Sequence, residues 1–331
     1  MAVQHLSHLL RSVVLVPFAD RTRMRPNCSV KATETVLTFS RMRLSPHREN
    51  EVLLQLAGFR YLTRELTEDF LFAGSSLTPL SRQVITRRVL SRLKRRGLIL
   101  ETPRLVGPAG GTARLVYFLT AAGYSRARSL DPGLPAHRPG LRGTWLMGHG
   151  LMCAEVALAF RRAARSHPGH EVLDWECDWQ AAERLGATLV VPDAHLVYST
   201  SGWLLDAFIE VDLGTEGSRV FARKIEHYLE LYRDGTWGRH LEGFPVVLTV
   251  ASSATRAALL RRATTAVVEA AFDSELIKSV TAFDFTTLGD LLGPSGPLGT
   301  IWSMAGKSGL HPLFGPEQLG TTPGSEAPLR R

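Results

Sequence analysis

The sequence predicts an α/β chain (α+β overall) with two domains: a basic helical domain that ends in a hairpin, and a larger domain with a mixed sheet. Its 331 residues suit about two domains. Helical apolar spacing dominates residues 45–130, whereas strands alternate with helices from 144 onwards. Residues 45–130 contain fourteen Lys and Arg and six Asp and Glu. Residues 131–291 contain fifteen Lys and Arg and twenty-one Asp and Glu. This reversal predicts different roles for the two domains.

The remaining segments are assigned by composition. We expect residues 1–44 to form a basic mobile arm, 131–143 a Pro/Gly linker, 144–292 the second domain, and 293–331 a loosely ordered tail. No apolar run approaches the ~18 residues that span a bilayer, so no membrane partner is expected. The three cysteines form no C-x-x-C pair, which excludes a cysteine zinc site and favours a reducing, cytoplasmic location.

The first domain reads as three helices followed by a hairpin. Thr63 is a plausible cap for the second helix, and Pro at the start and Gly97 at the end delimit the third. This order is typical of a winged helix-turn-helix, in which the third helix enters the major groove and the hairpin lies along a phosphate strand. The expected helices span 45–58, 63–72 and 78–96, and the hairpin strands span 98–101 and 114–119.

The third helix has two unlike faces. At ~100° per residue, Ile85, Val89 and Leu93 lie on one face with Leu90 at its edge. The opposite face, with two arginines beside the hairpin, is predicted to bind double-stranded DNA. The alternative is an ordinary solvated basic face, and nothing in the pattern specifies a base sequence. The predicted DNA-binding residues are Arg87, Arg88, Ser91, Lys94, Arg95, Arg104 and Arg114.

Acidic residues gather on a predicted hairpin in the second domain. If Ser201 and Gly202 form its two-residue loop, paired residue numbers sum to 403 and Asp193 stands opposite Glu210. Alternation then separates an apolar face, taken as the core face, from an acidic one. The acidic face carries Asp193, His195, Asp206, Glu210 and Asp212.

Carboxylates grouped in this way repel one another unless a cation compensates. Mg²⁺ prefers carboxylate and water oxygens, so Asp193, Glu210 and Asp212 are predicted metal ligands, with Mn²⁺ as a possible substitute. The alternative is a solvated sheet face with ordinary surface acids.

Two further residues are candidates for this site. Glu155 is the only acid in the predicted helix 145–165, where it would either orient a metal-bound water or cap an internal amide. Lys224 flanks the packing stripe of the helix that follows the hairpin. It would either lean towards the acids and stabilise developing phosphorane charge, or simply extend its ammonium group to solvent.

These residues together resemble the bacterial replication-relaxation family over about 45–285. The resemblance rests on the basic winged helix, the linker, His149-Gly150-Leu151 with Glu155, Pro192-Asp193-Ala194, the string from Glu210 to Glu216, and Lys224 with Tyr228. That family is associated with plasmids and other mobile elements and is implicated in DNA relaxation and replication initiation. Its C-terminal half is similar to the PD-(D/E)XK nuclease fold, which would make Asp193 and Glu210 the acidic pair and Glu155 the first-helix acid.

One position departs from the nuclease pattern. Asp212 stands where the pattern has a lysine, and Lys224 would have to replace that lysine from the helix. The resemblance implies a Mg²⁺-dependent enzyme that nicks or cleaves DNA, with plasmid replication or conjugation proteins as partners. The alternative is a non-catalytic winged-helix regulator or replication accessory with a degenerate nuclease fold. A Ser or Cys hydrolase is disfavoured because no G-x-S-x-G element is present.

Overall fold

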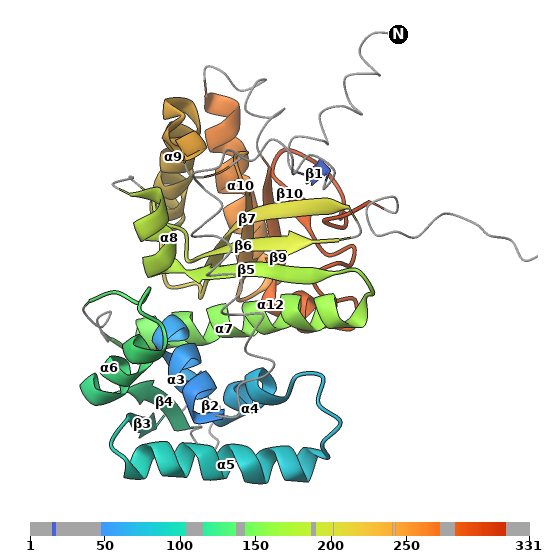
Figure 1. Cartoon of the computed structure of the whole chain (residues 1–331). Helices are drawn as coiled ribbons and strands as arrows, with labels where there is room; N and C mark the ends of the chain where they lie inside the picture. The colour runs from blue at the N-terminus through green and yellow to red at the C-terminus, as the bar shows by residue number, and fades with distance from the viewer. Residues whose placement is uncertain are drawn as a thin grey trace, which may run out of the picture. The chain divides into compact units, whose positions relative to one another are not determined.

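The computed structural model describes residues 15–17, 48–103, 115–136, 143–186, 190–200, 202–239, 241, 243–271 and 282–315. The chain divides into two compact units. The winged-helix unit is Val30–Leu158, and the sheet unit comprises Met1–Ser29 with Ala159–Arg331. Figure 1 shows the elements of both units, coloured from blue at the N-terminus to red at the C-terminus.

The winged-helix unit contains the predicted helices and hairpin. Its small sheet has the strand order β2-β4-β3, in which both pairings are antiparallel. Buried Leu53, Leu93 and Ile99 bring the first helix, the third helix and the hairpin into one core. The elements are α3 (Arg48–Phe59), β2 (Leu62–Thr63), α4 (Arg64–Phe72), α5 (Pro79–Arg95), β3 (Ile99–Pro103), β4 (Leu115–Leu119) and α6 (Ala121–Leu130).

Side-chain caps fix where the two helices of the helix-turn-helix begin. The Thr63 hydroxyl accepts a hydrogen bond from the Leu66 N–H at 3.2 Å, and Thr78 does the same for Ser81 at 3.2 Å. Pro79 follows Thr78 at the first helical position, where no N–H donor is required. Both predicted helix starts are therefore confirmed.

The division between the units falls inside α7 (Gly143–Ser166), whereas the sequence placed it at 131–143. The first half of α7 belongs to the winged-helix unit, where Gly150 comes close to the end of α3. A Cβ atom at Gly150 would lie 2.8 Å from the carbonyl oxygen of Phe59. This close approach explains why the boundary lies beyond the Pro/Gly segment. Residues 137–142 of the predicted linker lie outside the described residues.

The sheet unit is built on a mixed seven-stranded sheet among the described residues, with the order β10-β9-β8-β7-β6-β5 and β1 beside β7. The pairs β7–β8 and β8–β9 are parallel, and the others are antiparallel. This confirms the predicted α/β class with a partly parallel sheet. The elements are β1 (Leu15–Pro17), β5 (Glu171–Cys177), α8 (Asp178–Leu185), β6 (Ala194–Ser199), β7 (Trp203–Asp212), α9 (Ser218–Asp234), η4 (Thr236–Arg239), β8 (Val246–Ala251), α10 (Ala254–Ala270), β9 (Phe283–Thr287), α12 (Leu288–Leu292) and β10 (Ser303–Met304).

The register of the β6–β7 hairpin is the predicted one. Ala194 pairs with Ile209 and Ser199 with Leu204, so the residue numbers of each pair sum to 403. Asp193 comes just before the ladder and continues it, because its N–H donates to the Ile209 carbonyl at 3.0 Å. Asp193 and Glu210 are therefore neighbours across the hairpin.

The prediction that only the apolar face belongs to the core is wrong. On the apolar face, Tyr198 packs edge-on against Phe160 of α7, with ring centroids 6.0 Å apart. On the acidic face, Phe208 stacks on Tyr228 of α9 at 5.7 Å. Helices therefore cover both faces, and Glu210 is only 2% exposed. Alternation sorts side chains between two faces but does not reveal what covers each face.

Two predicted segments contain more structure than expected. Residues 293–315 of the predicted loose tail fold onto the sheet: β10 pairs with β9, and Trp302 and Phe314 are fully buried. The apolar side chains of this segment explain its packing. Within the predicted mobile arm, Leu15–Pro17 pairs with the first residues of β7. The rest of the arm and residues 316–331 lie outside the described residues.

The predicted strand 172–179 ends early. β5 stops at Cys177, where the chain turns into α8, a helix that the sequence did not predict. The Cys177 N–H donates to the Gln180 side chain at 3.0 Å, so a reciprocal cap starts the helix inside an apolar run. No helix in the described part of the chain combines the length and apolar character needed to cross a membrane.

Candidate functional site

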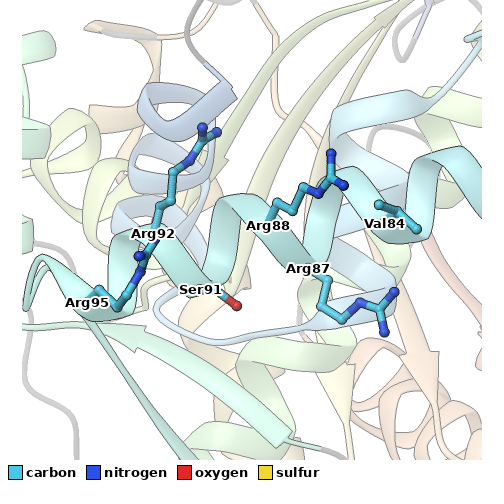
Figure 2. A pocket seen from close by; sticks show the side chains of 6 residues that line it. All are labelled: Val84, Arg87, Arg88, Ser91, Arg92 and Arg95. Atoms are coloured by element: carbon cyan, nitrogen blue, oxygen red, sulfur yellow. The ribbon is translucent and has the colours of Figure 1, made fainter.

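The outer face of α5 carries the predicted DNA-binding side chains. Thr86, Val89, Leu90 and Leu93 are buried, whereas Arg87, Arg88, Ser91, Lys94 and Arg95 are exposed. The predicted division of the helix into a packed and a cationic face is therefore present in the structure, except that Ile85 is only half-buried. Figure 2 shows Arg87 and Ser91 projecting from one side of the helix and Arg88 and Arg92 from another. The labelled residues line a shallow hollow along the helix.

The cations of α5 fall into two groups. Arg92 and Arg96, at the end of the helix, both contact Glu49 of α3, at 2.9 and 2.6 Å. Lys94 pairs with Glu101 of β3, so its charge is partly neutralised. Among the described residues, Arg87, Arg88 and Arg95 form no ion pair.

The predicted wing cations cannot be placed. Arg104 and Arg114 lie outside the described residues, between the two strands of the hairpin. Both remain predictions. The described cationic surface is thus the α5 face, defined by Arg87, Arg88 and Arg95 with Ser91.

Three of the predicted catalytic residues meet in the sheet unit. Lys224 of α9 forms an ion pair with Glu210 and lies 3.7 Å from Asp193. Tyr228, one helical turn later, donates its hydroxyl to Glu210. We name this group the Glu210 cluster: Asp193, Glu210, Lys224 and Tyr228. Of the two alternatives predicted for Lys224, the structure shows the one in which its ammonium group is directed towards the acids.

The Glu210 cluster contains one cation for two carboxylates. Burial raises the pKa of Glu210, and the nearby Asp193 raises it further, while Lys224 opposes the shift. Burial alone would lower the pKa of Lys224, but the two carboxylates raise it above its usual value. Both pKa shifts have the same cause, which is the presence of two carboxylates and one cation. The lysine stays charged, and the anionic form of one acid is disfavoured.

Asp212 has a different partner from the other acids. Both of its carboxylate oxygens accept hydrogen bonds from Arg256 of α10, at 2.6 and 2.7 Å. One oxygen also accepts the Gly214 N–H at 2.8 Å. Asp212 is 5% exposed, so this bidentate pair neutralises a buried charge and joins β7 to α10.

The donors around these acids do not fit a Mg²⁺ ion. Glu210 accepts from Lys224 through one oxygen and from Tyr228 through the other. Asp193 accepts the Val211 N–H at 2.8 Å, and its second oxygen faces Lys224. A metal ion would have to displace an ammonium group that already occupies the space between the acids. No group of three or more His, Cys, Asp or Glu in the described ranges has the arrangement of a metal site.

Glu155 and the Glu210 cluster belong to different units of the chain. Glu155 is half-buried on the part of α7 that belongs to the winged-helix unit. Its expected role beside Asp193 and Glu210 stays a prediction.

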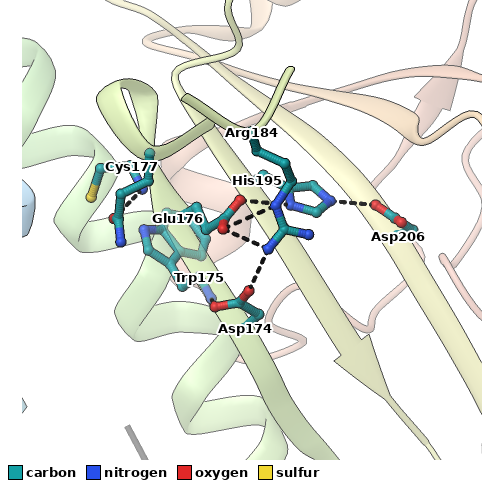
Figure 3. Close-up of polar contacts among 8 residues, drawn as sticks. Asp174, Trp175, Glu176, Cys177, Arg184, His195 and Asp206 are labelled. Carbon is teal, nitrogen blue, oxygen red and sulfur yellow. Dashed lines mark hydrogen bonds and ion pairs between the residues drawn. The ribbon is translucent and has the colours of Figure 1, made fainter. Parts of the chain in front are cut away.

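A second buried charge network crosses β5, β6 and β7 (Figure 3). His195 is 1% exposed, and its two ring nitrogens lie 3.3 Å from Glu176 and 2.5 Å from Asp206. Arg184 of α8 contacts Glu176 at 2.6 Å and Asp174 at 3.2 Å. We name these five residues the His195 network.

The His195 network holds its histidine in the charged form. Burial alone would lower the pKa of His195, but Asp206 and Glu176 raise it to about 9. Burial would likewise raise the pKa of Glu176, but His195 and Arg184 keep it below its usual value. Both imidazole nitrogens must then act as donors, which matches an acid on each side.

A comparison with family models finds one match, described as replication-relaxation, over residues 53–247. The chain belongs to the replication-relaxation family. The matched span is more than half of the chain and contains every predicted site residue. Comparison with curated proteins and with solved structures found no match. Membership of the replication-relaxation family supports a replication-related, DNA-associated role.

The replication-relaxation match ends at Val247, before Arg256. Sequence reasoning missed the pairing of Asp212 with Arg256, because 44 residues separate them and the contact depends on parallel strand order. It also gave His195 no role, although the alternation rule had placed His195 on the acidic face. The signal available for both was the same: a buried carboxylate needs a cationic partner.

Proposed function

We propose that this replication-relaxation protein binds double-stranded DNA through α5 and that its sheet unit does not cleave DNA. The observation that carries the proposal is the exposure of Arg87, Arg88 and Arg95 on the third helix of a winged helix-turn-helix, with no ion pair among the described residues. Cations in this position neutralise phosphates and release counterions, which is the main source of affinity for duplex DNA.

The non-catalytic part of the proposal is supported by the Glu210 cluster. An active site of the PD-(D/E)XK type needs carboxylate oxygens that are free to bind a metal ion. Here Lys224 and Tyr228 already bind Glu210, and Arg256 binds Asp212. A buried ion pair of this kind holds β7 against α9 and α10, so we assign these acids a structural role.

Binding is tested with the full chain and a labelled duplex of mixed sequence. Replacing Arg87, Arg88 and Arg95 together with Ala should weaken binding tenfold or more. The matched control replaces Arg219, Arg223 and Arg262, which are exposed on α9 and α10, and removes the same charge. Equal losses in the two triple variants would mean that net charge, and not α5, produces the binding.

Cleavage is tested with supercoiled plasmid in Mg²⁺ and in Mn²⁺. We expect no nicked or linear product from the wild type above the level of Glu210→Ala. Metal-dependent nicking that disappears in Glu210→Ala and Asp193→Asn would restore the nuclease hypothesis, with Lys224 moving aside on metal binding.

A further inference from the structure

The exposed face of α5 is not uniformly cationic. Leu80 is 70% exposed, more than any other large apolar side chain among the described residues, and Gln83 is exposed three residues later. At ~100° per residue, Leu80, Arg87 and Ser91 fall within about 40° of one another, and Gln83 lies within about 60° of Leu80. Arg88 and Arg95 both lie on one side of this line, within about 80° of Leu80, and Gln83 lies on the other side. The N-terminal half of the face therefore carries an apolar group, an amide and a guanidinium in sequence.

This pattern differs from a face that only attracts phosphates. A surface that recognises phosphates alone gains from a cation at each position, whereas an exposed leucine gains nothing from a phosphate. Base edges in the major groove offer different partners: a thymine methyl group for an apolar side chain, adenine N6 and N7 for an amide, and guanine O6 and N7 for a guanidinium. Leu80, Gln83 and Arg87 match these three partners.

The position on the helix supports the same assignment. In helix-turn-helix proteins the N-terminal residues of the recognition helix contact base edges. Leu80 and Gln83 lie in the first five residues of α5, and Arg87 begins the third turn. Of the cations nearer the end of the helix, Arg92 and Arg96 bind Glu49 and Lys94 binds Glu101, whereas Arg95 forms no ion pair among the described residues. In the N-terminal half, Arg82 lies 4.0 Å from Glu68 of α4, whereas the exposed Leu80, Gln83 and Arg87 have no ion pair or side-chain hydrogen bond among the described residues.

We propose that α5 reads base sequence in the major groove, with Leu80 on a thymine methyl group, Gln83 on adenine and Arg87 on guanine, while Arg88 and Arg95 contact phosphates. The proposal rests on DNA binding by α5 and adds that the bound duplex has a preferred sequence containing these three bases within one half-turn. The cations on one side of the leucine favour nucleic acid as the occupant of this face, because an apolar protein partner would not require Arg88 and Arg95 beside the leucine.

The experiment is selection of bound duplexes from a random library by the full-length protein. The wild type should enrich a site with a guanine and an adjacent thymine and adenine. Arg87→Ala should lose discrimination at the guanine by roughly fivefold or more. Leu80→Ala should lose discrimination at the thymine. Replacing that thymine with uracil, which lacks the methyl group, should cause the same loss of discrimination in the wild type. Arg88→Ala is the matched control, with lower affinity and unchanged preference.

Three results would overturn the inference. Salt-sensitive binding without sequence enrichment would leave the proposed DNA binding intact and end the base-reading assignment. Enrichment that is unchanged in Leu80→Ala, Gln83→Ala and Arg87→Ala would place base reading elsewhere in the chain. A change of oligomeric state in Leu80→Ala with an unchanged selected site would show that Leu80 contacts a second copy. Failure of the wild type to bind any duplex would instead contradict the proposed function itself.

Discussion

The two units use the same charged residue types in opposite ways. On α5, Arg87, Arg88 and Arg95 are exposed and form no described ion pair. In the sheet unit, Lys224, Arg256 and His195 each contact a buried acid. A charged side chain at the surface can bind a ligand at little cost in free energy. A charged side chain inside a core is already paired, and breaking that pair destabilises the fold. Geometry and burial, and not residue type, therefore separate binding charges from structural ones.

The largest expected effect comes from breaking a structural charge. Lys224→Met leaves Glu210 and Asp193 buried without their cation, and should lower the free energy of unfolding by about 3 kcal/mol, at the low end for a buried pair because 26% of the lysine side chain is exposed. Glu210→Gln should cost much less, since it also relieves repulsion from Asp193. Urea denaturation measures both. Equal and small losses would show that the cluster is not structural.

The second effect concerns pH and the His195 network. The pKa of His195 is raised from 6.5 to about 9, so the charged form stabilises the fold fully below pH 6.5 and the gain is lost as pH rises through 9. The loss should amount to roughly 3 kcal/mol at most. Tm should therefore fall between pH 6.5 and 9 in the wild type.

His195→Gln supplies the control for this pH dependence. Glutamine cannot change charge, so its Tm should vary less over the same range, while Arg184 still neutralises Glu176. If the wild type and His195→Gln show parallel Tm curves from pH 6.5 to 9, the histidine is not charged in the folded state.

A smaller effect concerns the exposed cations of α5 and the salt dependence of DNA binding. For duplex binding, the slope of log K against log salt should decrease by about 0.9 for each phosphate contact removed by Arg88→Ala or Arg95→Ala. Lys94→Ala should change the slope less, because Lys94 already pairs with Glu101. Fluorescence anisotropy at several salt concentrations gives the slopes. A larger decrease for Lys94 than for Arg88 would reverse our assignment of free and paired cations.

The smallest expected effect is that of metal ions. Saturating Mg²⁺ or Mn²⁺ should leave Tm unchanged, because Lys224 occupies the space between Asp193 and Glu210. Calorimetry with and without metal, in the presence of duplex DNA, measures this. A rise in Tm that Glu210→Gln removes would show that the acids bind metal after all.

Local sequence rules predicted the parts of this protein that depend on local geometry. The cap at Thr63, the two faces of α5 and the β6–β7 register each follow from residues a few positions apart. Parts that depend on distant packing were not predictable in the same way. The burial of Glu210 requires α9 to cover the acidic face, and Asp212 meets Arg256 only because β7 and β8 are parallel neighbours. The charge pattern predicted a metal site, and the structure shows that side-chain cations contact two of the same acids, Glu210 and Asp212.

Because the boundary between the units falls inside α7, it limits which segments relatives can exchange by recombination. The first half of α7 belongs to the unit that binds DNA in our proposal, and its second half, with Phe160 on Tyr198, belongs to the sheet unit. A chimera spliced at 131–143 would separate Gly150 from the backbone at Phe59, to which it is fitted. Recombination between relatives should therefore succeed most often when the donor of the winged helix also contributes α7 as far as Leu158. A crossover inside this continuous helix, and not in the Pro- and Gly-rich segment before it, would then preserve both halves.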